Sequence, residues 1–204
     1  MSRRVLRIIV GALVLCALGA AAVYARRCSD RATLKIAYMD AAAEAEGRGD
    51  WSAAATAYRK ALAVDRRYLP ARTGLAEMYS QQGREDLALR EYRRGVAADP
   101  RNPDAHVAVA HWCIEHHRYA GAAAALKQAI RLAPRETFPR VLLVHVCRWN
   151  GQFAQARDQL AELEKLSPGS PDLRRARRAT ERQAQRARNE AASKRNQAQP
   201  TAAR

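Results

Sequence analysis

The chain has 204 residues, of which 48% are hydrophobic, 6% aromatic and 27% charged, and its net charge at pH 7 is +16. This length suits one sizeable helical domain, and the few aromatics and weak β-branched periodicity argue against a β-rich class. The charge lies mostly at the ends, because residues 1–30 carry a net +4 and residues 171–204 a net +7. The excess of basic residues therefore belongs more to the two terminal segments than to the residues between them. The composition predicts an all-α fold.

The first segment along the chain is predicted to engage a membrane. Three arginines within the first seven residues precede residues 8–25, which are uncharged and would span roughly 27 Å as a helix, about the thickness of a bilayer's hydrocarbon core. We interpret residues 1–30 as a signal anchor; the alternative is a signal peptide cleaved after Ala22 or Ala25. The short basic terminus favours a single-pass protein of the inner (cytoplasmic) membrane, N-terminus inside, with the following domain in the periplasm.

Residues 35–170 contain one pattern that returns four times at a period of 34 residues. Apolar and small residues recur at spacings of three and four, as on one buried helical face, and glycine or proline ends each run. The repeating positions are a glycine, a proline, a small residue and a bulky residue four positions after it: Gly49, Gly83, Gly151; Pro100, Pro134, Pro168; Ala54, Ala88, Ala122, Ala156; Tyr58, Tyr92, Leu126, Leu160.

This pattern resembles the tetratricopeptide (TPR) repeat, a helix–turn–helix unit of this period. The resemblance implies a superhelical solenoid of four repeats, at residues 35–68, 69–102, 103–136 and 137–170, preceded by one transmembrane helix and followed by a C-terminal capping helix. Three positions depart from the pattern. Arg66 stands where the first proline is expected, His117 replaces a glycine, and Leu163 replaces a small residue.

The resemblance also implies a concave groove, lined by the first helix of each repeat, that binds a peptide or a partner helix. Because Trp and Arg are enriched in binding hot spots, Arg148 and Trp149 are the predicted main contacts; packing of Trp149 against the following helix is the alternative. The residues do not match a carboxylate clamp for chaperone tails. The implied groove residues are Met39, Thr73, Glu77, Val107, His111, Glu115, Val141, His145, Arg148 and Trp149.

No motif for catalysis or for a cofactor is present, so we predict neither an enzyme nor a cofactor. The four cysteines form no C-x-x-C pair, and buried free thiols are expected at Cys113 and Cys147. His111 and Glu115, four residues apart, could share a metal with His145; the alternative, which we favour, is a solvated groove with scattered polar groups. No metal site is predicted.

The last segment, residues 171–204, is predicted to be a basic capping helix that runs into a disordered tail. Ser170, Pro171 and Asp172 are typical of a helix start, and Leu173 is the last large apolar residue. The basic side chains could hold anionic lipid or the phosphates of nucleic acid; a solubilising cap is the alternative. The candidates for an anionic surface are Arg174, Arg175, Arg177, Arg178 and Arg182.

Together these features predict a membrane-anchored TPR scaffold that binds a partner segment in its groove and supports the assembly or maintenance of a cell-envelope complex. The alternative is a cytoplasm-facing adaptor whose Arg-rich tail binds anionic lipid or nucleic acid. Nucleic acid is disfavoured, because no aromatic residues are interleaved with the arginines to stack on bases.

Overall fold

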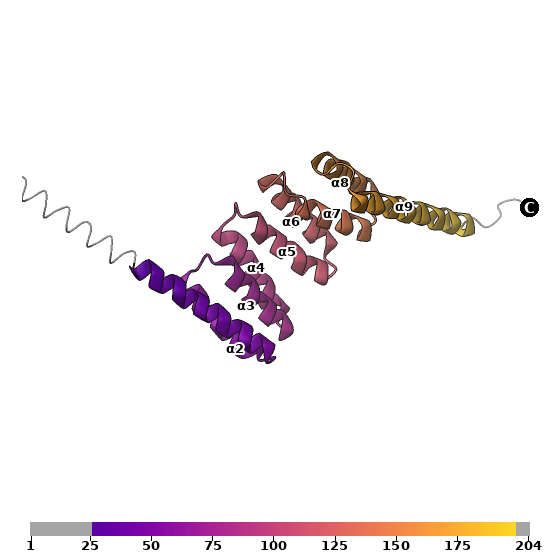
Figure 1. Cartoon of the computed structure of the whole chain (residues 1–204). Coiled ribbons are helices and arrows are strands. Elements are labelled where there is room, and N and C mark those ends of the chain that lie inside the picture. The colour runs from indigo at the N-terminus through magenta and orange to yellow at the C-terminus, as the bar shows by residue number, and fades with distance from the viewer. Residues whose placement is uncertain (1–25, 199–204) are drawn as a thin grey trace, which may run out of the picture. The chain divides into compact units, whose positions relative to one another are not determined.

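The computed structural model describes residues 26–198, and within that range every regular element is a helix (Figure 1). The first helix covers residues 26–47. The expected all-α class is therefore confirmed for the described residues. The later helices are α2 (Trp51–Val64), α3 (Leu69–Gln81), α4 (Glu85–Ala98), α5 (Pro103–Glu115), α6 (Tyr119–Leu132), α7 (Phe138–Trp149), α8 (Phe153–Leu166) and α9 (Pro171–Ala198).

The chain divides into two compact units, Met1–Glu91 and Tyr92–Arg204, and the division falls inside α4. In the first unit α2 packs against α3; in the second, α5, α6, α7 and α8 each pack against the next helix in sequence. Packing of each helix against its neighbour in the chain is the construction principle of a repeat protein. Each unit therefore builds its core from successive helices.

No helix among residues 26–198 is both long and apolar enough to cross a membrane. The helix of residues 26–47, for example, carries Arg26, Arg27 and Asp30 in its first turns, and each charge would be costly in hydrocarbon. This finding contradicts the predicted inner-membrane location with periplasmic repeats. The segment expected to span the bilayer, residues 8–25, lies outside the described residues, and a transmembrane helix is not part of the described fold.

Small residues at the repeating positions allow neighbouring helices to approach closely. The bulky residues four positions later are also buried, from 0% exposed at Leu126 to 7% at Tyr58. Protein interiors tolerate little change in side-chain volume, so this alternation of small and large residues determines the helix spacing. The small residues with 0% exposure are Ala54, Ala88, Ala122 and Ala156.

Gly74 of α3 marks a close approach between α3 and α2 in the first unit. A Cβ atom at this position would lie 2.3 Å from Cζ of Tyr58 on α2, well inside van der Waals contact. The Tyr58 hydroxyl donates a hydrogen bond to Glu46 Oε1 at 2.6 Å, which fixes the ring over the glycine. Burial, and then this hydrogen bond, raise the pKa of Tyr58. Glycine is therefore needed at position 74 for packing.

A residue with left-handed backbone follows the first helix of each pair. Gly49, Gly83 and Gly151 have φ angles of +72°, +70° and +71°, and His117 has φ of +55° at the equivalent position. This conformation is free of steric cost for glycine and costs other residues roughly 1 kcal/mol or more. The departure at His117 thus keeps the same turn and stores strain in it.

A residue in the first turn of α3, α5 and α7, at equivalent positions 34 residues apart, contacts the loop that precedes its helix. Arg72 also donates from Nη1 to Glu91 Oε2 at 3.0 Å, and both side chains of this ion pair are largely buried, at 13% and 8% exposed. These polar contacts tie each loop to its helix pair. The loop contacts join side-chain nitrogens to carbonyl oxygens at 2.6, 3.1 and 3.2 Å in Arg72–Arg66, His106–Pro100 and Arg140–Pro134.

α9 begins like the first helix of a further pair but ends differently. Arg174, at the equivalent position, donates to the carbonyl of Gly169 at 2.7 Å. The residue 34 positions after Gly151 is Gln185, so no left-handed residue ends the helix, and it continues to Ala198. The helix thus takes up residues 171–198 of the segment for which a capping helix and a tail were predicted. Its buried and half-buried side is a stripe at spacings of three and four, namely Leu173, Ala176, Thr180 and Ala184.

Candidate functional site: an exposed aromatic surface on the second unit

The ten residues predicted to line the groove are distributed over both units. Met39, Thr73 and Glu77 belong to the first unit, and the other seven lie on α5 and α7 of the second. Met39 packs against the buried core of the first unit, and Thr73 Oγ1 donates to the carbonyl of Pro70 at 3.0 Å. Of these three residues, only Glu77 is fully exposed. The sequence-predicted residues that gather on a surface are therefore those of the second unit.

Five rings of the second unit make ring contacts in two groups, one of two rings and one of three, and we call them together the aromatic surface: His111 with Phe138, and His145, Trp149 and Tyr119. The ring centroids are 6.1 Å apart for His111 and Phe138, 5.8 Å for His145 and Trp149, and 5.9 Å for Tyr119 and Trp149. Phe138 is 55% exposed and Trp149 53% exposed. Large aromatic side chains left in water at one place are typical of a binding surface.

The spacing of residues along α7 explains why these rings share one side. Phe138, His145 and Trp149 are separated by seven and four residues, so they lie on one face of the helix, with half-buried Val141 between them. The opposite face is buried and apolar, formed by Leu143, Val144, Val146 and Cys147. The core thus holds α7 in the orientation that exposes the rings.

His145 is the aromatic-surface residue with a perturbed pKa. Burial is the main cause and the positive charge of Arg148 is the second; both lower the pKa of His145 below its ordinary value of 6.5. The ring is therefore neutral at physiological pH. A neutral imidazole next to Trp149 adds to an apolar surface and leaves a ring nitrogen for hydrogen bonding.

Arg148 contacts the C-terminal helix. Its Nε donates to Gln183 Oε1 of α9 at 2.8 Å. Gln183 lies 34 residues after Trp149, so α9 continues the repeat geometry beside α7. This contact orients the Arg148 guanidinium at the edge of the aromatic surface and leaves its Nη groups as donors.

The remaining predicted groove residues in this unit are Val107, which is half-buried, and Glu115, which is exposed. Among residues 26–198, no group of three or more His, Cys, Asp or Glu side chains is arranged to hold a metal ion. Cys113 and Cys147 are free and buried, as expected from their repeat positions.

The five arginines predicted as an anionic-surface tail are all exposed on α9. Arg175 Nη1 lies 3.5 Å from Asp172 and Arg177 Nε lies 3.4 Å from Glu181, and both pairs are largely exposed to solvent. Exposed pairs of this kind contribute little to stability. The arginines therefore stay accessible to a ligand.

Sequence reasoning missed two members of the aromatic surface, Phe138 and Tyr119. Each is the first residue of a helix. From the sequence alone, a residue at a helix boundary cannot be told from a residue of the preceding turn. The signal for Phe138 was its spacing of seven from His145. Tyr119 is the first residue of α6.

The sequence profile of the Tetratricopeptide repeat family matches residues 45–111 and 114–180. The chain belongs to the tetratricopeptide repeat family. The resemblance inferred from the 34-residue period is confirmed, and TPR repeats in general form scaffolds that bind peptide segments of other proteins. No curated protein matches the sequence.

Several solved TPR structures are similar to this chain. The structure described as MamA protein is 21% identical, with a TM-score of 0.59, over 78% of this chain and 87% of that one. PilF of Pseudomonas aeruginosa is 25% identical, with a TM-score of 0.59, over 74% and 69% of the two chains. YrrB, described as a TPR protein with an unusual peptide-binding site, is 20% identical, with a TM-score of 0.53, over 70% and 74%. The first and third likenesses show the fold alone.

Proposed function

We propose that this TPR protein is a non-catalytic scaffold that binds a peptide segment of another protein on the aromatic surface of its second unit. The observation that carries the proposal is the exposure of Phe138 and Trp149 on one face of α7, 55% and 53% respectively. Burying such rings against a partner's apolar side chains releases water, and aromatic residues frequently dominate binding energies.

The polar groups around the rings favour a partner that has both apolar side chains and hydrogen-bonding groups. Arg148 is held by Gln183 at 2.8 Å and can still donate to a carboxylate or a backbone carbonyl. Glu115 is exposed one turn beyond His111 and can accept from a backbone N–H or pair with a basic side chain. The expected ligand is a segment with one or two large apolar side chains, placed by hydrogen bonds at its edges.

The test is selection of 12-residue peptides from a random phage-displayed library on the full chain, followed by calorimetric titration of the best synthetic peptide. Trp149→Ala should weaken binding by about 30-fold, the loss typical of a hot-spot aromatic. Leu166→Ala is the matched control, because Leu166 is a large hydrophobic residue, 38% exposed, on α8 of the same unit. Failure to select any peptide, or equal losses in both variants, would contradict the proposal.

The exposed arginines of α9 support a second candidate, which is binding of a phosphate-bearing polyanion. Arg175, Arg178 and Arg182 line one shallow hollow on the helix, at spacings of three and four. Such a surface predicts affinity for RNA or anionic vesicles that falls steeply between 50 and 200 mM salt, as estimated for several phosphate contacts. Titration of a fluorescein-labelled RNA and of vesicles rich in phosphatidylserine distinguishes the two sources. No binding of either at 50 mM salt would exclude this candidate.

A further inference from the structure

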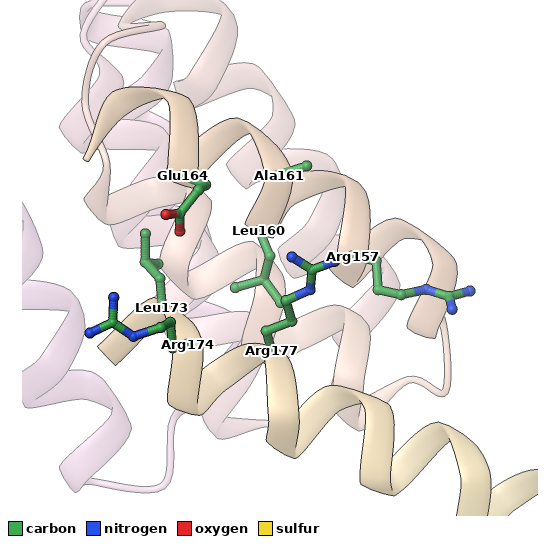
Figure 2. A pocket seen from close by; sticks show the side chains of 7 residues that line it. All are labelled: Arg157, Leu160, Ala161, Glu164, Leu173, Arg174 and Arg177. Atoms are coloured by element: carbon green, nitrogen blue, oxygen red, sulfur yellow. The ribbon is translucent and has the colours of Figure 1, made fainter. Parts of the chain in front are cut away.

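A separate hollow lies between α8 and α9 in the second unit (Figure 2). Its volume is about 320 Å³, and Leu160, Ala161 and Leu173 form the apolar part of its lining. Figure 2 shows Leu173 and Arg177 projecting from α9 toward Glu164 and Leu160 of α8. A hollow of this volume accommodates one or two side chains of a ligand.

The charged residues that line the hollow differ in the hydrogen bonds that they make within the protein. Glu164 Oε1 accepts from the backbone N–H of Gly169 at 2.9 Å, and Arg174 donates to the carbonyl of the same glycine at 2.7 Å. Both therefore contact the loop between the two helices.

The two other arginines are available to a ligand. Arg157 makes no hydrogen bond or ion pair with any residue in the described range. Arg177 uses only Nε, at 3.4 Å from Glu181, so both of its Nη groups keep their donors. The lining contains three arginines and one glutamate, so its net charge is positive.

We propose that this hollow is a second protein-binding site, which takes an acidic peptide segment with one large apolar side chain between carboxylates. The apolar side chain would enter between Leu160 and Leu173, and the carboxylates on its two sides would pair with Arg177 and, further along α8, with Arg157 (Figure 2). Guanidinium groups bind carboxylates with two parallel hydrogen bonds, which suits them to acidic motifs. The apolar floor separates this site from a plain polyanion surface, because nucleic acid offers no aliphatic side chain to fill it.

The experiment measures fluorescence anisotropy of a fluorescein-labelled synthetic peptide, in which one leucine is flanked by two glutamates on each side, titrated with the full chain at 150 mM salt. Two control peptides replace the four glutamates by glutamine or the leucine by serine. We expect each replacement to weaken binding by about tenfold, since one removes the ion pairs and the other the buried side chain.

A matched pair of protein variants separates this site from the general charge of α9. Arg157→Gln/Arg177→Gln removes the two available arginines of the hollow, and Arg178→Gln/Arg182→Gln removes two that line a different hollow on the same helix. The first variant should weaken peptide binding by about tenfold and the second by less than twofold. Equal losses, or tighter binding of RNA than of the peptide, would overturn the proposal.

Two further measurements keep the test independent of folding and of the aromatic surface. Ala161→Trp fills the hollow from an exposed position without changing its charge, and should abolish binding while circular dichroism stays unchanged. Trp149→Ala should leave this affinity unaltered, so failure of the aromatic-surface proposal would not imply failure here. Undiminished binding by Ala161→Trp would place the peptide elsewhere.

Discussion

His117 has a left-handed backbone, φ +55°, at a position where the other first helices are followed by glycine. We expect His117→Gly to stabilise the protein by roughly 0.5–1 kcal/mol, because glycine removes the steric cost of this conformation. The midpoint in differential scanning calorimetry should rise by a few degrees.

Gly151→Ala is the opposing control for this change, since it introduces the same strain one repeat later and should lower the midpoint. A lower midpoint for His117→Gly would mean that the ring contact between His117 and Tyr119, with centroids 5.9 Å apart, outweighs the strain.

The lowered pKa of His145 makes stability depend on pH in a defined direction. The folded state disfavours the protonated ring, so protonation in the unfolded state, which begins as the pH falls through the ordinary pKa of 6.5, reduces the free energy of unfolding. The contribution of His145 is therefore complete above that value and is lost on acidification. We expect His145→Gln to flatten the decline of the urea midpoint between pH 7 and 5. His106→Gln serves as control, and an unchanged slope in His145→Gln would refute the assignment.

Among elements, the pair α3 and α4 depends on the ion pair of Arg72 and Glu91. Its nitrogen and oxygen are 3.0 Å apart, and both side chains are largely buried. Removing one partner leaves a charge with little access to water, so Glu91→Leu should cost about 3 kcal/mol in chemical denaturation. Glu162→Leu, which breaks the exposed pair with Lys165, should cost less than about 0.5 kcal/mol. Similar losses from the two substitutions would show that burial does not govern this contact.

Repeating features of the helices could be predicted from the sequence, because their signal is local. A small residue, a bulky residue four positions later and a glycine or proline stop recur at one period, and the family match confirms that interpretation. The aromatic surface was only partly foreseen. His111, His145 and Trp149 follow from helical phase, whereas Phe138 required knowing that α7 begins at that residue.

Contacts that depend on the length of α9 could not be predicted in the same way. The bond from Arg148 to Gln183 joins residues 35 positions apart and exists only because the helix continues past the end of the expected cap. Ion pairs and loop contacts of single arginines carry no periodic signal. The membrane location followed from hydropathy alone and is contradicted by the described helices.

At the scale of the whole molecule, the buried stripe of α9 predicts where the chain can be shortened. Thr180 is 0% exposed and Ala184 9% exposed, whereas residues 185–195 are all exposed. Deleting residues 188–204 should therefore leave the thermal midpoint within about 2 °C, since little apolar surface is uncovered. Deleting residues 171–204 should lower it by several degrees and promote aggregation, because the side of α8 that contacts α9 becomes exposed. Equal midpoints for the two truncations would show that α9 contributes nothing to the core.

No left-handed residue ends α9 at Gln185, so a further helix pair could be built from this position. The clamp from Arg174 to Gly169 and the buried stripe already place this helix where a fifth pair would start. A glycine at position 185, a short turn and a second helix with alanine at its close-approach position would complete that pair. The interface between α8 and α9 would stay as it is. A single duplication of 34 residues could therefore lengthen the molecule.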